Sequence, residues 1–115
     1  MRKLATRSML LVLILVSLMA LSAGAQGASK TLEGKVLSSK DTPISGAIVY
    51  LQNGKTNSIR SFISTANGSY NFGQLAADTD YQIWARYKNA KSDTRGISSY
   101  DSRSKVIINL RIKIK

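Results

Sequence analysis

Few side chains in this chain are capable of acid–base or nucleophilic chemistry. The 115 residues include no histidine and no cysteine, and the acidic residues are Glu33 and five aspartates. The common zinc sites, cysteine nucleophiles and histidine general bases all require these missing residue types. No serine lies in the nucleophile-elbow motif of serine hydrolases. We therefore predict that the protein is not an enzyme and has no catalytic residue, bound metal or cofactor.

Carboxylates are the one remaining set of possible metal ligands. Asp78 and Asp80 are two residues apart, and Asp101 could supply a third carboxylate. A calcium ion takes six or more oxygen ligands, and the sequence around this pair lacks a complete binding-loop signature. We interpret the pair as part of a solvated turn.

Trp84, the only tryptophan, is the first candidate for a binding site. Alternation along residues 81–87 places it on the same strand face as Arg86. An exposed indole beside a guanidinium could stack on a sugar ring or anchor a protein partner, with Tyr100 or Tyr87 as a second aromatic. The structural interpretation, which we favour, packs the indole beneath a loop or a basic side chain, including in a cation–π contact.

The second candidate is a row of basic residues near the C-terminus. Period-two alternation places Val106, Ile108, Leu110, Ile112 and Ile114 on one strand face. The other face carries Ile107 and Asn109 and then the cations Arg111, Lys113 and Lys115. These cations could bind an anionic polymer. They could also block edge-to-edge aggregation, as charges on outward strand faces do, and we favour this structural role.

The net charge indicates the kind of partner that the chain attracts. Three of the 17 Lys and Arg residues and none of the six acidic residues precede residue 26, which leaves a net charge of +8 for residues 26–115. Such a charge favours anionic partners. The basic residues are spread without a run of five like charges, so the simpler interpretation is a soluble exported domain kept monomeric by its own charge.

Short strands must position these side chains. Stretches rich in β-branched and aromatic residues alternate with turn signals, of which Asn53-Gly54 and Asn67-Gly68 are the clearest. No window after the N-terminal segment shows a sustained helical period. Six or seven strands at roughly ten-residue spacing are typical of a β-sandwich, so we predict an all-β fold. The strands are expected at residues 32–37, 47–51, 59–65, 70–72, 81–87 and 106–115, with a short one at 96–97.

The N-terminus has the pattern of an export signal. A positively charged start precedes an apolar run from Met9 to Leu21 and then the small residues Ala23-Gly24-Ala25. The run is shorter than the roughly 20 residues of a membrane span. We predict a signal peptide at residues 1–25 and one domain at residues 26–115, secreted or periplasmic, with no stable membrane span after cleavage. An uncleaved membrane anchor is the alternative.

Three motifs combine into a recognisable pattern. Leu32–Val36 contains Gly-x-Val, Thr42–Leu51 contains Pro-Ile-x-Gly-Ala-x-Val-x-Leu, and Ser64–Phe72 reads as a hairpin that Leu75 and Tyr81 follow. Together they resemble the carboxypeptidase regulatory-like domain, over about residues 31–88. With the export signal and the tail at residues 97–103, the chain is similar to the short stand-alone bacterial version. The resemblance implies a seven-stranded transthyretin-like (prealbumin-like) β-sandwich.

The resemblance also implies an accessory module, because the zinc ligands of the associated peptidase domain have no counterpart in this chain. We predict an exported binding or structural module of the cell envelope that docks an envelope protein. The alternative is a carbohydrate-binding module that uses an exposed Trp84 to bind a glycan. Export makes a nucleic-acid partner unexpected, and the sequence leaves the oligomeric state open.

Overall fold

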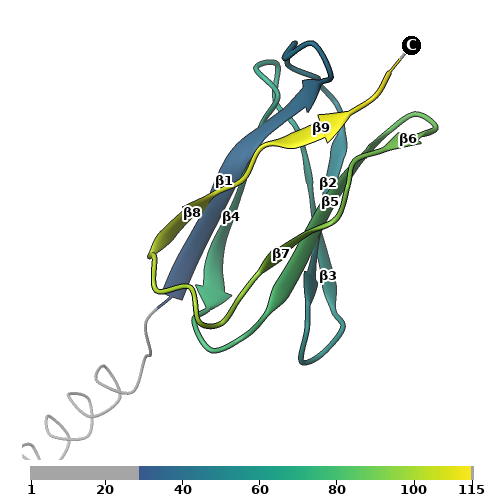
Figure 1. Ribbon diagram of the computed structural model, residues 1–115. Coiled ribbons are helices and arrows are strands. Elements are labelled where there is room, and N and C mark those ends of the chain that lie inside the picture. The colour runs from purple at the N-terminus through teal and green to yellow at the C-terminus, as the bar shows by residue number, and fades with distance from the viewer. Residues whose placement is uncertain (1–28, 115) are drawn as a thin grey trace, which may run out of the picture.

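The computed structural model describes residues 29–114, and these form strands and connecting loops in two layers (Figure 1). No helix in this range is long and apolar enough to cross a membrane. The predicted signal peptide lies outside the described residues. The strands are β1 (Ser29–Ser38), β2 (Ile48–Asn53), β3 (Ile59–Ile63), β4 (Ser69–Ala76), β5 (Tyr81–Tyr87), β6 (Ala90–Lys91), β7 (Arg95–Ile97), β8 (Lys105–Ile107) and β9 (Leu110–Ile112).

Two sheets face one another. The first has the order β4-β1-β8, with β9 also paired to β1, and the second has the order β3-β2-β5-β6, with β7 also paired to β5. β8 and β9 lie in one line parallel to β1, and β6 and β7 lie in one line antiparallel to β5. The nine segments therefore fill seven strand positions, three in one sheet and four in the other. This confirms the predicted seven-stranded sandwich.

The core lies between the sheets and follows the alternation of the strands. In β5, Tyr81, Ile83 and Ala85 are buried, whereas Gln82 and Arg86 are exposed. Since each strand of a sandwich presents one face to the opposite sheet, these patterns assign an inner and an outer face to both layers. The main buried residues from the other strands are Leu32, Val36, Val49, Leu51, Tyr70, Phe72, Leu75, Ile97, Val106, Leu110 and Ile112.

The predicted continuous C-terminal strand is wrong in one respect, because the strand is interrupted at Ile108 and Asn109. The register against β1 is the same on both sides of the break, since Glu33 pairs with Ile107 and Val36 with Leu110. The Ile108 amide still donates to Glu33 O at 3.0 Å. Asn109 instead accepts the Lys35 amide through its side-chain Oδ1 at 3.0 Å. The peptide group between Ile108 and Asn109 therefore does not take part in the backbone hydrogen bonding with β1. β9 then continues in line with β8.

Candidate functional site

The outer face of the second sheet gathers the candidate site. In β2 and β5 the buried positions alternate with outward ones, and cross-strand register sets the outward residues side by side. Tyr50 lies opposite Trp84, and Ile48 lies opposite Arg86. Arg86 in turn pairs with Lys91 of β6. We call this surface the Trp84 face; it consists of Ile48, Tyr50, Ile63, Trp84, Arg86 and Lys91.

An aromatic stack occupies the centre of the Trp84 face. The rings of Tyr50 and Trp84 have centroids 5.5 Å apart and an interplanar angle of 21°. Lys91 Nζ lies 5.7 Å from the centroid of the indole. Because β2 and β6 flank β5 on opposite sides, the half-buried indole lies between the tyrosine ring and the ammonium group. The predicted cation–π contact is therefore present, with Lys91 as its cation.

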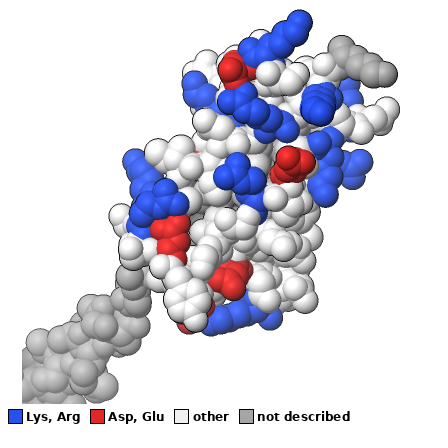
Figure 2. Space-filling view, viewed as in Figure 1, with Lys and Arg blue, Asp and Glu red and all other residues white. Residues whose placement is uncertain are grey.

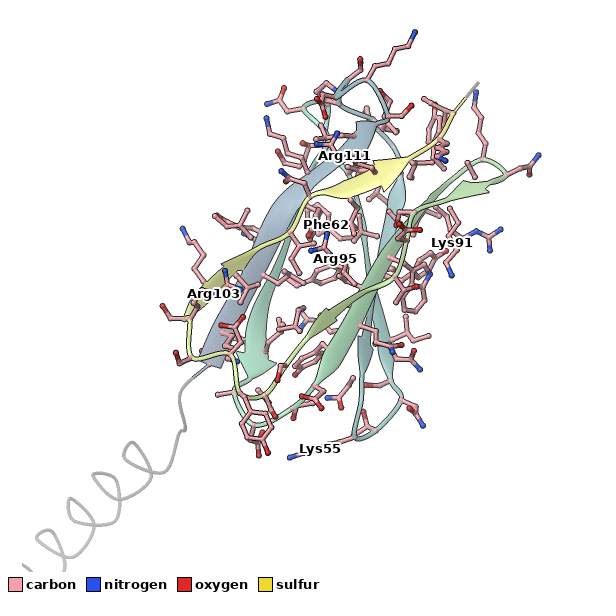
Figure 3. The ribbon with its side chains drawn as sticks, in the orientation of Figure 1. Lys55, Phe62, Lys91, Arg95, Arg103 and Arg111 are labelled. Atoms are coloured by element: carbon pink, nitrogen blue, oxygen red, sulfur yellow. The ribbon has the colours of Figure 1, made fainter. Side chains whose placement is uncertain are left out.

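Isoleucines extend the apolar area from this stack toward the edge of the sheet. Ile48 pairs with Ile63 of β3, and these side chains are 38% and 67% exposed. Arg86 and Lys91 are exposed on the other side, and neither takes part in a salt bridge within residues 29–114. Figure 3 shows Lys91 on the side of the second sheet that faces away from the first. The result is an apolar centre with a cationic rim.

Tyr100 does not belong to this face. Its side chain is 95% exposed and lies in the loop between β7 and β8, which Ser99 ties to Asp80 through a 2.6 Å hydrogen bond from its amide to Oδ1. Tyr87 contributes to the inner side, where it packs against the core. The aromatic partner of Trp84 is Tyr50, which the sequence analysis missed. Its signal was the alternation of residues 47–51, but the register between β2 and β5 was needed to use it.

The basic candidates of the C-terminal strand lie on the other sheet. Arg111 of β9 is exposed and forms an ion pair with Asp41 in the turn that follows β1. Lys113 is exposed just beyond β9. In the view of Figure 2 the basic side chains are scattered over the surface. The five predicted site residues therefore fall into three places: Trp84 and Arg86 on β5, Tyr100 in the loop before β8, and Arg111 and Lys113 at the end of the chain.

Local partners satisfy the loop carboxylates. Lys55 donates to Asp78 at 3.0 Å, and this hydrogen bond is the main reason why the pKa of Asp78 lies below its usual value. Arg103 donates to Asp101, and this hydrogen bond likewise lowers the pKa of that carboxyl. Within residues 29–114 no group of three potential metal ligands occurs. These carboxylates act as turn and salt-bridge residues.

The fold is shared with proteins of different activities. The dioxygenase domain of a dioxygenase carbohydrate-binding protein fusion from Streptomyces sp. SirexAA-E superposes with a TM-score of 0.60 at 11% identity, covering 78% of this chain and 82% of that one. BcpA, the major pilin subunit of Bacillus cereus, gives 0.59 at 14% identity, with coverages of 76% and 31%. Catechol 1,2-dioxygenase from Acinetobacter sp. ADP1 gives 0.55 at 12%, with coverages of 78% and 54%.

The dioxygenases correct the prediction that this chain is not an enzyme. That prediction depended on missing residue types and on the resemblance to an accessory module, yet the same fold occurs in proteins described as dioxygenases. Fold alone does not determine activity, so the architecture cannot carry a conclusion against catalysis. At these identities the similarity establishes the fold. The chain spans about a third of the pilin and about half of the catechol dioxygenase.

The sequence comparison gives a narrower result than the structural one. No curated protein matches the sequence. The family described as carboxypeptidase regulatory-like domain matches residues 31–112. This range runs from β1 to the end of β9 and so includes both sheets. Membership of this family fits a structural or binding module. Because the match covers most of the 115 residues, the chain belongs to the carboxypeptidase regulatory-like domain family.

Proposed function

We propose that this protein is an exported binding module whose Trp84 face docks a protein of the cell envelope. The observation that carries the proposal is the Tyr50–Trp84 stack on the outer face of a sheet, beside two partly exposed isoleucines and two exposed cations. Aromatic and arginine side chains are the commonest energetic anchors of protein interfaces. An apolar centre with a charged rim is the usual arrangement of such a surface.

The geometry favours a protein over a glycan as the partner. A sugar ring binds by lying on the face of an aromatic ring. Here Tyr50 covers one side of the indole and Lys91 approaches from the other. The ring edges and the isoleucine side chains remain available, and these suit the apolar side chains of a protein partner. Carbohydrate binding through Trp84 would require Lys91 or Tyr50 to move away.

Charge complementarity indicates the chemistry of the partner. None of the six residues of the Trp84 face is acidic. Arg86 and Lys91 are exposed, and the net charge of residues 26–115 is +8. We expect a partner that presents carboxylates around an apolar side chain, because opposite charges at the rim accelerate association. Binding should weaken as salt rises, since rim charges are screened.

A photo-crosslinking experiment in the native host tests this proposal. A photoreactive phenylalanine analogue would replace Ile48 on the Trp84 face and, as the matched control, Ile107 on the outer face of the first sheet. We expect one recurrent protein adduct from position 48 that is lost when Arg86→Glu and Lys91→Glu are added. Equal adducts from both positions would contradict docking by this face.

A glycan array with the purified protein provides the alternative outcome. Binding to an envelope glycan that is lost in Trp84→Ala, without a protein adduct from position 48, would replace the proposal with a carbohydrate-binding function. Trp84→Phe is the companion variant, because it keeps an aromatic ring opposite Tyr50. A purely structural role of the indole would leave both assays unchanged by either substitution.

A further inference from the structure

The edges of the two sheets are protected unequally. An exposed edge strand presents unpaired N–H and C=O groups that can pair with another chain, and proteins usually interrupt or charge such edges. β4 carries a register shift against β1 and has Gln74 at a φ of 58°. The β6–β7 line consists of segments of two and three residues. The β8–β9 line is broken at Ile108 and carries exposed Lys105 and Arg111.

β3 has no comparable protection within the described residues. Its five residues pair with β2 in an unbroken antiparallel register. The backbone N–H of Ser64, just beyond β3, donates to Ala47 O at 2.8 Å. Bonded positions recur at every second residue of an antiparallel pair. The even-numbered residues of β3 thus bond to β2, and the free edge consists of the N–H and C=O groups of Ile59, Ser61 and Ile63.

The side chains along this edge are apolar and uncharged on the outer face. Ile59 is 53% exposed and Ile63 is 67% exposed, with exposed Ser61 between them. The only charged residue of β3 is Arg60. Its guanidinium donates to Gly73 O at 3.0 Å and lies 5.5 Å from the centroid of the Phe72 ring. Arg60 therefore points to the facing sheet, and its charge does not block strand pairing along the free edge of β3.

We propose that β3 pairs with β3 of a second copy of this chain, antiparallel and about a two-fold axis at Ser61. The outward residues read Ile-Ser-Ile, which is the same in both directions. The axis places Ile59 of each copy opposite Ile63 of the other, and all three free residues fall in hydrogen-bonding positions. Such an interface is self-complementary, as a two-fold dimer requires. On the inner face of the paired strands, Arg60 of each copy lies opposite Phe62 of the other.

We infer that the strand pairing with the β3 edge comes from a second copy of this chain. The outward residues of β3 are symmetric, so that the exposed Ile59 of one copy meets the exposed Ile63 of the other. Pairing a five-residue strand buries much less than the roughly 1,200–2,000 Å² of a standard stable interface. Two copies that each carry +8 over residues 26–115 also repel. The dimer is therefore weak, and added salt strengthens it by screening the repulsion. This salt dependence is opposite to that expected for docking at the Trp84 face.

Sedimentation velocity on the exported protein tests the dimer from about 10 μM to about 1 mM. Ile63→Lys places a cation at the edge and should weaken dimerisation about tenfold or more. Ile107→Lys is the matched control, since Ile107 is 60% exposed on β8; it should change the dissociation constant less than threefold. A wild-type protein that stays monomeric throughout, or a dimer that Ile63→Lys does not weaken, would overturn the proposal.

A cysteine crosslink provides a second measurement that does not depend on the lysine variant. The chain has no cysteine, so Ser61→Cys can form only an intermolecular disulfide. Bonded antiparallel residues have Cα atoms about 5.5 Å apart, which suits a disulfide. We expect Ser61→Cys to oxidise to a dimer at least tenfold faster than Asn71→Cys, an exposed position on edge strand β4. Equal rates would contradict the two-fold axis.

The two proposals can fail separately. Self-association is measured with the purified protein alone, so its result does not depend on a docking partner. Trp84→Ala should leave the dimerisation constant unchanged, because Trp84 lies two strands away from the β3 edge. If the Ser61→Cys variant, tested in the native host, crosslinks to a different protein and forms no homodimer, the β3 edge pairs with a foreign strand and the proposed dimer is overturned.

Discussion

The hydroxyl of Tyr70 donates a 2.5 Å hydrogen bond to the backbone carbonyl of Ile108, two strands away in the same sheet. Gly34 of the intervening β1 pairs with Tyr70, and its missing side chain leaves room for the contact. A Cβ at Gly34 would lie 1.8 Å from Ile108 O and 3.0 Å from the Tyr70 hydroxyl. The glycine therefore allows a buried carbonyl to leave the ladder, and the tyrosine satisfies it.

Tyr70→Phe should lower the free energy of unfolding by about 1–3 kcal/mol, because the Ile108 carbonyl loses its buried donor. Chemical denaturation of the protein measures this change. Tyr50→Phe is the control, since Tyr50 is only partly buried and lies on the outer face; it should stay within about 0.5 kcal/mol of the wild type. Equal losses in both variants would argue against a special role for the Tyr70 hydroxyl.

Gly34→Ala should destabilise the protein more severely, by about 3 kcal/mol or more, because the new methyl group overlaps a backbone carbonyl. Gly96→Ala is a matched control in a strand, since nothing lies within 4 Å of a Cβ at that position. It should be neutral or stabilising by up to about 1 kcal/mol. Thermal melting compares the two, and a wild-type melting temperature for Gly34→Ala would refute the close contact.

The alkaline stability of the protein should depend on Tyr70. Burial raises the pKa of this phenol above its usual value, and the charge of Arg95 opposes the shift to a smaller extent. The folded state keeps the proton at a pH where the unfolded chain releases it. The contribution of the neutral Tyr70 phenol to the free energy of unfolding is therefore complete below pH about 10. Above that pH it falls by up to about 1.4 kcal/mol per pH unit. Tyr70→Phe should show a shallower loss between pH about 9 and about 11.

Removing the ammonium group beside Trp84 should expose the indole. Lys91→Ala is expected to increase acrylamide quenching of the single tryptophan and to lower stability by about 0.5–1 kcal/mol, the usual strength of an exposed cation–π contact. Lys88→Ala is the control, because Lys88 Nζ lies over the Tyr87 ring at 5.3 Å instead. Identical quenching in the wild type and Lys91→Ala would show that Lys91 does not cover the ring in solution.

Local patterns in the sequence determined the class of fold and much of the core. Alternation in residues 81–87 and 106–112 separates inner from outer side chains, and both patterns are found in the structure. The turn at Asn67-Gly68 is also present, with Gly68 at a φ of 77°. Such features depend on neighbours in the chain, because strand geometry repeats every two residues and a tight turn is built by a few consecutive residues.

Contacts between distant strands were decided by the tertiary structure alone. The stacking of Trp84 on Tyr50 requires one particular register between β2 and β5. The break at Ile108 requires Gly34 and Tyr70, which come from two other strands. The ion pair of Arg111 with Asp41 joins residues 70 positions apart. Alternation assigns a residue to a face of its strand, but only the pairing of strands determines its neighbours on that face.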